Sequence, residues 1–446
     1  MLSKIEKALQ RTTDTKECII GAGVVSRTGE LFKKCFPLSR AIIVADTNTW
    51  TVAGAQVSDS LRKAGVLQCD PYVFDDPHLY AEWTFVQMLK ARLQAEDSVA
   101  VAVGSGVIND LTKYVSHLLG RPYLCVGTAA SMDGFTAYGA SITKDGNKQT
   151  FDCPAPYAFV MDPEIAAAAP KELAASGYAD LIAKIPAGAD WMLAHCVGAE
   201  KIDPFSWSLV QDGLRESLSH PADILAGDVA CTEALCEGLL MSGFAMQALQ
   251  SSRPASGTEH QFSHCWDMEG LAYPDGRHVS HGFKVGIGTL VSTATLEFLL
   301  GKDLSAIDID KAVVEWPSWE EMELQIRRVC EGKPGHLARC LTESKAKYTD
   351  RDGLRAQLFA IRRAWPELKE QIAGQILSFS EVYRNLKQVG APYEPEQICV
   401  SRAHLRSTFS IIPFMRSRFT GIDLVYRLGL LPQLEHYLFA PGGIFE

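Results

Sequence analysis

The sequence predicts an N-terminal α/β domain with a Rossmann-like parallel sheet, followed by an all-helical C-terminal domain. Over the first 160 or so residues, short β-rich runs alternate with helix-like stretches. The β-rich runs are almost continuously apolar, which is typical of parallel strands covered on both faces. After about Pro170 the chain becomes rich in Ala and Leu, and strand-like runs almost vanish. We therefore expect domains at residues 1–165 and 166–446, with an active site in the interdomain cleft.

Composition restricts the class of protein. At 446 residues the chain is long enough for two or three domains, and its 47% hydrophobic content is that of a soluble globular protein. The formal net charge of −10 disfavours nucleic acid and anionic membranes as partners. The N-terminus lacks the features of a secretory signal, and apolar stretches such as GLLMSGFAMQAL are shorter than a membrane span. Twelve scattered cysteines without a CxxC pair indicate reduced thiols, so we expect a cytoplasmic protein.

The expected strands are, in chain order, ECIIGAGVV, RAIIVADTNT, DPYVFDD, SVAVAVGSG and RPYLCVGTAAS. The second of these contains AIIVAD and ends at Asp46. An acid at such a strand end can bind both hydroxyls of an adenine ribose, which would favour NAD over NADP by repelling a 2′-phosphate. It can equally form an Asx turn or cap a helix that begins with TNTW.

The fourth expected strand runs into Gly104, Ser105 and Gly106 and then into a helix. Glycines at this place let the backbone approach a pyrophosphate, and the helix N-terminus supplies free N–H groups. Asn109 stands where the GxGxxG fingerprint has its third glycine, so the ordinary Rossmann motif is not present. On this motif alone, a tight turn without a ligand is the alternative.

The fifth expected strand leads into VGTAASMDGF, residues 126 to 135. The small residues that follow the strand are Thr128, Ala129, Ala130 and Ser131. Ligands of open α/β sheets bind at this edge, where the strands end. Asp133, just beyond, can hydrogen-bond to a substrate hydroxyl or merely cap the turn.

Four of the eleven histidines fall within about twenty residues, at positions 260, 264, 278 and 281. His260 and His264 are four residues apart, so a helix would present both on one face. A mononuclear catalytic metal needs about three protein ligands and an open position, and mixed histidine and carboxylate sets suit Zn²⁺, Fe²⁺ or Ni²⁺. The alternative is a solvated helix that carries polar residues on one face, with His278 in a turn.

Asp180 is the candidate carboxylate, because it stands in the otherwise apolar helical segment GYADLIAK. A buried acid on such a helix must be paired, hydrogen-bonded or bound to a metal. The alternative is an exposed ion pair with Lys184, one helical turn later.

The motifs GSGVIND, VGTAASMDGF, GYADLIAK, TEHQFSH and the HG at 281–282 occur in this order. Together they resemble the sn-glycerol-1-phosphate dehydrogenases, especially their bacterial branch. That family belongs to a larger group with the iron-containing alcohol dehydrogenases, the metal-dependent glycerol dehydrogenases and 3-dehydroquinate synthase. The similarity spans roughly residues 15 to 300. The combination of TAASMDGF with EHxFSH favours the glycerol-phosphate branch.

The resemblance implies a role for each matching residue. It makes Asp180, His260 and His281 the metal ligands, with His264 and Asp133 in contact with substrate and Asp180 serving both purposes. It places the following residues along NAD or NADP, of which Asp46 favours NAD: Asp46, Gly104, Ser105, Gly106, Val107, Ile108, Asn109, Asp110, Thr128, Ala129, Ala130 and Ser131. Ala137 departs from the family pattern, which often has a cofactor-binding serine four residues after the aspartate.

The implied reaction is the reversible, metal-dependent reduction of dihydroxyacetone phosphate to sn-glycerol 1-phosphate by NAD(P)H, with one Zn²⁺, Ni²⁺ or Fe²⁺ ion. Lys184 and Lys148 are candidates for holding the phosphate, and either can also be an ordinary surface lysine. Three alternatives remain open: a lyase of the 3-dehydroquinate synthase type, a polyol dehydrogenase for unphosphorylated glycerol, and a non-catalytic binding protein. A homodimer is the default expectation for a soluble oligomer. Residues 310–400 have no assigned role.

Overall fold

The computed structural model describes residues 3–446, which divide into two compact units. The first unit contains the chain up to Leu181, together with Phe205–Ser252 and Gln388–Ala391. The second unit contains Ile182–Pro204, Arg253–Lys387 and Pro392–Glu446. The helical stretch Phe205–Ser252 belongs to the first unit because its long helix packs against helices near the sheet. The expected domain ranges, 1–165 and 166–446, therefore differ from these units and remain a prediction of where the chain divides functionally.

The first unit is built on a six-stranded sheet. Its strands are β1 (Glu17–Ile20), β2 (Ala41–Asp46), β3 (Tyr72–Phe74), β4 (Val99–Gly104), β5 (Tyr123–Gly127) and β8 (Ala158–Met161). All pairs are parallel, in the order β1-β8-β5-β4-β2-β3, which confirms the expected Rossmann-like sheet. From β2 the chain moves outward to β3, then returns to β4 and continues to β5 on the other side. In open α/β sheets ligands bind at such a reversal, which here lies at the carboxyl ends of the neighbouring strands β2 and β4.

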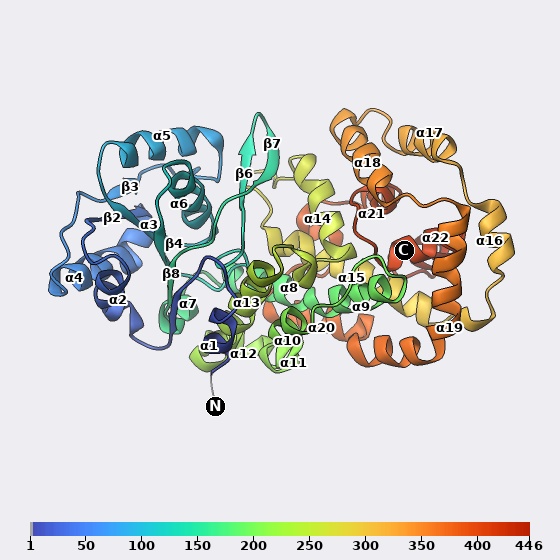
Figure 1. Ribbon diagram of the computed structural model, residues 1–446, viewed down its shortest axis with the longest axis horizontal. Helices are drawn as coiled ribbons and strands as arrows, with labels where there is room; N and C mark the ends of the chain where they lie inside the picture. The colour runs from blue at the N-terminus through green and yellow to red at the C-terminus, as the bar shows by residue number, and fades with distance from the viewer. Residues whose placement is uncertain (1–2) are drawn as a thin grey trace. The chain divides into compact units, whose positions relative to one another are not determined.

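Helices cover both faces of this sheet (Figure 1). On one face α2 (Thr28–Cys35) and α4 (Ala55–Lys63) contribute to a core with alternate strand residues such as Ile43 and Val101. The opposite face carries α5 (Trp83–Gln94) and α6 (Gly106–Leu118). Every residue of β4 and β5 is buried, so these strands read as continuous apolar runs in the sequence.

The remaining elements of the first unit are mostly helical. They are α1 (Lys4–Leu9), η1 (Val24–Arg27), α3 (Thr47–Thr49), η2 (Trp50–Gly54), the hairpin of β6 (Ala140–Lys144) and β7 (Asn147–Phe151), α7 (Pro163–Ala168), α8 (Lys171–Ile182), α10 (Pro204–Gln211), α11 (Leu214–Ser217), α12 (Pro221–Ala226) and α13 (Val229–Leu249). Helix α13 packs on α7 and α1.

The second unit is built from helices and the loops between them, which confirms the expected helical C-terminal part. Its elements are α9 (Lys184–Cys196), η3 (Arg253–Ala255), α14 (Thr258–Met268), α15 (His281–Leu300), η4 (Leu304–Ala306), α16 (Ile309–Glu315), α17 (Trp319–Val329), α18 (Pro334–Lys347), α19 (Arg351–Gln375), α20 (Phe379–Val389), η5 (Pro395–Ile398), α21 (Arg402–Phe409), η6 (Ile412–Phe414), α22 (Gly421–Arg427) and α23 (Leu431–Phe439).

Helices α14 and α15 pack closely against each other in the second unit. The contact passes through Gly288 of α15, where an added Cβ would overlap the backbone carbonyl of Glu259. Any larger residue at this position must push the two helices apart. The spacing between the two helices is therefore fixed by a glycine.

Two helices, α13 and α15, are long and apolar enough to cross a membrane, by length and composition alone. Their most apolar windows are 56% and 89% buried inside the structure. Apolar stretches thus reach further than the sequence indicated, but burial of this kind is that of core helices in a soluble protein.

Candidate active site

Asp46 lies at the carboxyl end of β2, where the strand order reverses. Its Oδ1 accepts hydrogen bonds from the backbone N–H groups of Asn48 (2.8 Å) and Thr49 (2.9 Å), which caps the short helix α3. Of the two interpretations that the sequence offered, the helix cap is present. A further contact with a ribose stays a prediction.

The glycine-rich turn after β4 presents the beginning of α6. Among the described residues, no side chain caps this helix, so its first N–H groups remain available for an anion. Ser105 Oγ lies 2.7 Å from Ser131 Oγ, and the N–H of Thr128 donates to the carbonyl of Gly104 at 3.2 Å. These two bonds tie the loop after β4 to the loop after β5. The predicted dinucleotide residues 104–106 and 128–131 thus lie together at one sheet edge.

The first turns of α6 hold the other predicted cofactor residues, Val107 to Asp110. Asn109 Oδ1 accepts a hydrogen bond from Tyr123 Oη at 3.0 Å, and Asp110 Oδ2 accepts one from the N–H of Ser141 at 3.2 Å. Burial raises the pKa of Asp110 to about 6, against the opposing charge of Lys113. Both side chains serve the internal packing of the unit, so we expect this turn to contribute backbone N–H groups to phosphate binding.

The loop after β5 is held against α8. A Cβ on Gly177 of α8 would overlap the carbonyl oxygen of Ala130, so the glycine permits this close approach. Asp180, also on α8, accepts a hydrogen bond from the N–H of Asp133 at 3.0 Å. Asp133 Oδ2 in turn accepts one from Ser242 Oγ at 2.8 Å. The two aspartates to which the resemblance gives substrate contacts are therefore immediate neighbours.

Burial decides between the two interpretations of Asp180 and Lys184. Both side chains are fully buried, so the alternative of an exposed ion pair is wrong. A carboxylate buried to this degree needs charge or hydrogen-bond compensation, as a metal ligand would have.

Lys113 is a residue that the sequence interpretation missed. Its buried ammonium group donates hydrogen bonds to the carbonyls of Gly134, Ala137 and Gly139 at 2.9, 2.9 and 3.0 Å. It therefore fixes the backbone of the loop in which Ala137 replaces the family's serine. The available signal was a lysine on the apolar face of α6, in LTKYV.

His260 on α14 and His281, the first residue of α15, form a pair in the second unit. Their ring centroids are 5.3 Å apart, and their candidate ligand nitrogens lie within 4.8 Å of each other. His260 Nδ1 lies 2.8 Å from Glu259 Oε1, and His281 Nδ1 lies 3.3 Å from Ser263 Oγ. Each ring therefore has a polar side chain beside its Nδ1, which orients the imidazole. Metal-binding histidines commonly have such partners, so the pair fits a divalent metal.

Glu259 and Ser263 are further residues that sequence reasoning missed, although both stand inside TEHQFSH. Glu259 is fully buried, and burial raises the pKa of its carboxyl group, against the hydrogen bond from the N–H of Gly257. The sequence offered a signal for both: Glu259 stands directly before the predicted ligand His260, and Ser263 stands three residues after it.

His264 lies one turn beyond His260 on α14 and has a different environment. Its Nε2 lies 3.3 Å from Nη1 of Arg416. Burial, followed by the charges of Arg416 and Arg339, lowers the pKa of His264 well below its usual range, which keeps the ring neutral. Because Arg416 is a donor, Nε2 accepts and the proton resides on Nδ1.

The fourth histidine of the group, His278, is exposed and follows a turn in which the N–H of Tyr273 donates to the carbonyl of Arg277. This is the turn that the sequence suggested. Lys148 is half-buried on β7, with its ammonium group 5.9 Å from the centre of the Tyr80 ring.

The chain is similar to a known family model and to several known proteins. A family model described as iron-containing alcohol dehydrogenase matches residues 19–170. The glycerol-1-phosphate dehydrogenase [NAD(P)+] of Geobacillus thermodenitrificans is 31% identical over 300 residues, which cover 66% of this chain and 74% of that protein. The enzyme of the same name from Bacillus licheniformis is 27% identical over 418 residues, 93% of this chain and 90% of that protein.

Among solved structures, the glycerol dehydrogenase from Schizosaccharomyces pombe superposes with a TM-score of 0.60 at 17% identity, covering 95% of this chain and 91% of that one. At this identity the likeness concerns the fold alone. The sequence relatives go further, because several exceed 30% identity over about three quarters of their length. As its motifs indicate, the chain belongs to the glycerol-1-phosphate dehydrogenase family.

Proposed function

We propose that this protein catalyses the reversible reduction of dihydroxyacetone phosphate to sn-glycerol 1-phosphate by NAD(P)H, with one divalent metal ion. The observation that carries the proposal is the pair of His260 and His281, whose ring centroids lie 5.3 Å apart and whose Nδ1 atoms are each held by a neighbouring side chain. The relatives that bear the name glycerol-1-phosphate dehydrogenase [NAD(P)+] supply the substrate and the cofactor class.

Asp180 is proposed as the third metal ligand. One carboxylate and two imidazoles form a donor set that can hold a metal ion, and Zn²⁺, Ni²⁺ and Fe²⁺ all accept it. The hydrogen bond from the N–H of Asp133 orients the Asp180 carboxylate, as outer partners of metal ligands do. When bound, the metal supplies Lewis acidity to the negative charge that develops on the substrate oxygen.

The chain's own groups perform the remaining tasks. The uncapped N-terminus of α6 provides N–H groups for the dinucleotide pyrophosphate, at the switch point of the sheet. Asp133, fixed by Ser242, is positioned to accept a hydrogen bond from a substrate hydroxyl. His264 is neutral and carries its proton on Nδ1, so it is proposed to contact the substrate as a donor.

Asp46 is proposed to favour NAD over NADP, and the protein is proposed to work in the cytoplasm on a phosphorylated substrate, as a homodimer or higher homo-oligomer. Membership of the glycerol-1-phosphate dehydrogenase family makes the protein an enzyme that acts on a small substrate.

The test is NADH oxidation by metal-reconstituted protein with dihydroxyacetone phosphate and unphosphorylated dihydroxyacetone side by side. We expect a strong preference for the phosphorylated ketone, and its loss when a chelator removes the metal. Equal use of both ketones would favour a polyol dehydrogenase. Turnover of neither, with metal and NAD bound, would overturn the proposal in favour of a lyase or a non-catalytic role.

A further inference from the structure

Four arginines of the second unit gather around the start of α14. They are Arg253 on η3, Arg339 on α18, and Arg416 and Arg418 in the loop before α22. Arg416 Nη1 donates to Ser256 Oγ at 3.3 Å, and Arg418 Nη1 donates to the Ser256 carbonyl at 2.9 Å. Ser256 is buried just before α14, so two guanidinium groups are anchored at the start of the helix that carries His260.

The four arginines have carboxylates among their neighbours, but two of the guanidinium groups, those of Arg416 and Arg339, also repel each other. Arg253 forms an ion pair with Glu200 at 3.3 Å, and Glu343 accepts a hydrogen bond from the N–H of Ser417 in the arginine loop at 2.7 Å. Burial lowers the pKa of Arg416, and among neighbouring charges the largest effect is the repulsion from Arg339. An anion bound between two cations that repel each other relieves their repulsion.

One buried hydrogen-bond donor of this group, on Arg339, has no partner among the residues that the structure describes. The donor is the Nε–H group of the guanidinium. Buried polar groups without partners are rare, and a ligand is one of the usual reasons for them. The arginine side chain as a whole is only half-buried, as is that of Arg416, so an anion can reach both.

The spacing from the metal-binding histidine fits one particular class of anion. Arg416 lies 3.3 Å from His264, which is one turn along α14 from His260. A turn of helix rises roughly 5.4 Å. In a three-carbon ketone phosphate, the phosphorus is separated from the carbonyl carbon by one methylene and one ester oxygen, which span a similar length. A carbonyl held near His260 would thus place its phosphate near Arg416.

We propose that Arg416 and Arg339 bind the phosphate dianion of the substrate and determine the preference for a phosphorylated ketone. The inference rests on the proposed function and deepens it. The planar guanidinium group presents parallel N–H donors that match two phosphate oxygens. Arg418 and Arg253 act as positioning residues, since they hold the carbonyls of Ser256 and Phe419. This assignment gives the phosphate to arginines of the helical unit and not to Lys184 or Lys148.

The experiment compares the metal-loaded wild type with Arg416→Met and Arg339→Met. Dihydroxyacetone phosphate, dihydroxyacetone and inorganic phosphate as an inhibitor are the three probes. We expect each variant to lose roughly 100-fold in kcat/KM for the phosphorylated ketone, the usual cost of a charged hydrogen bond. The loss in kcat/KM for unphosphorylated dihydroxyacetone is expected to be much smaller, so the ratio of the two kcat/KM values falls. Part of this smaller loss in Arg416→Met comes from the missing hydrogen bond to His264. Inhibition by phosphate weakens together with kcat/KM for the phosphorylated ketone.

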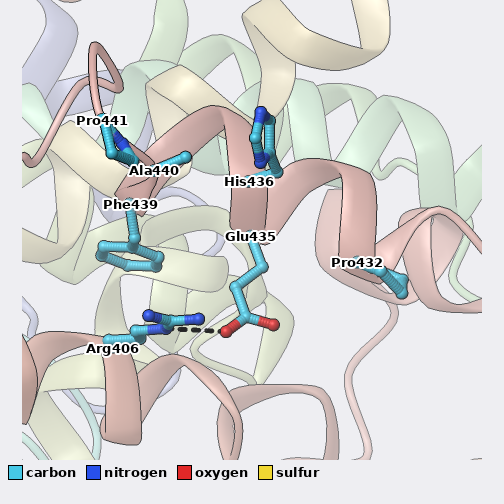
Figure 2. Close-up of a pocket in the computed structure, with 7 residues that line it drawn as sticks. All are labelled: Arg406, Pro432, Glu435, His436, Phe439, Ala440 and Pro441. Atoms are coloured by element: carbon cyan, nitrogen blue, oxygen red, sulfur yellow. Dashed lines mark hydrogen bonds and ion pairs between the residues drawn. The ribbon is translucent and has the colours of Figure 1, made fainter.

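Arg406→Met is the matched control. Arg406 lies on α21 and pairs with Glu435 at 2.8 Å, beside a pocket of about 360 Å³ (Figure 2). The control removes the same charge from the same unit at a group that already has its carboxylate. We expect it to leave the ratio of the two kcat/KM values and the phosphate inhibition as they are in the wild type.

A second pair of measurements separates this inference from the proposed function. Arg416→Lys keeps the charge but not the parallel donors, and we expect a smaller loss than for methionine. If the wild type reduces neither ketone, the proposed function fails, and thermal stabilisation by inorganic phosphate in wild type but not in Arg416→Met still supports the anion site. Equal loss for both ketones, or undiminished phosphate inhibition in folded variants, would overturn the inference. Should Arg416→Met fail to fold, Arg339→Met and Arg416→Lys decide by the same criteria.

Discussion

The sheet edge of the first unit and the α14 region of the second unit build their binding groups from different materials. At the sheet edge, the candidates are backbone N–H groups, glycines and small hydroxyl side chains from adjacent loops. Around α14, they are imidazole, carboxylate and guanidinium side chains from segments as far apart as His264 and Arg416. A backbone site suits a dinucleotide phosphate that needs shape and dipoles, whereas a metal and a phosphorylated ketone need formal charges placed one by one.

Replacement of the paired histidines should separate the two regions most sharply. His260→Ala or His281→Ala removes a proposed metal ligand, and we expect loss of bound metal with an activity loss of roughly 1,000-fold, since the metal's charge stabilisation is worth several kcal/mol. NADH should still bind. Metal content by mass spectrometry and NADH fluorescence are the readouts, with exposed His278→Ala as the control. Retention of metal by both variants would contradict the assignment.

Replacement of a side chain that contacts Nδ1 of a proposed ligand histidine should reduce metal binding less than loss of the histidine itself. Glu259→Gln keeps an oxygen near His260 Nδ1 but removes the charge, and we expect metal affinity to fall roughly 10- to 100-fold. Ser263→Ala, which removes the partner of His281, should act in the same direction. Competition with a coloured chelator measures both. A Glu259→Gln protein with wild-type metal affinity would show that the buried carboxyl serves packing alone.

A substitution of Gly104 should alter the sheet edge of the first unit without affecting the α14 region. A methyl group there would lie 2.6 Å from Cβ of Ile108, so the first turn of α6 must shift. We expect Gly104→Ala to weaken NADH binding roughly tenfold, in line with the value of a helix N-terminus to an anion, and to leave metal content unchanged. Gly374→Ala is the control, because an added Cβ there meets nothing within 4 Å. Unaltered NADH affinity would remove the turn from the cofactor site.

The smallest expected effect concerns stability and belongs to Asp190 on α9. Its two oxygens accept the N–H groups of Thr258 and Gly421 at 2.7 Å each, while burial and then the charge of Glu259 raise its pKa to about 7. A carboxyl group whose folded pKa exceeds the unfolded value stabilises at low pH, and this contribution is lost as the pH rises from about 4 to about 7. The slope is at most about 1.4 kcal/mol per pH unit.

Urea unfolding of wild type and Asp190→Asn over this pH range measures that slope. We expect the wild type to lose stability relative to the variant as the pH rises. Asp190→Asn also alters one hydrogen bond, which changes the free energy of unfolding by the same amount at every pH. The difference in slope between the two proteins is therefore unaffected. Parallel curves would mean that Asp190 does not titrate in this range.

The two regions also differ in how far the sequence alone predicted them. The parallel strands, the turns after β4 and β5, and the histidines proposed as metal ligands all came from contiguous motifs, since each lies within one or two elements. The contacts of Arg416 with Ser256 and His264 join residues 160 and 152 positions apart, which no local pattern reveals. Lys113 was missed for a related reason: a buried lysine is recognisable only when the carbonyls around it are known.

The geometry of the α14 region depends on Gly288, a residue that has no side chain. It offers no ligand atom, yet the absence of a methyl group there sets how far the helix of His260 lies from the helix of His281. Natural variation at this position would therefore be restricted as severely as at the histidines themselves. A survey of inactive variants would count it among the essential residues, and a designer who wished to adapt the opening between the two imidazoles to a larger ion would begin with it.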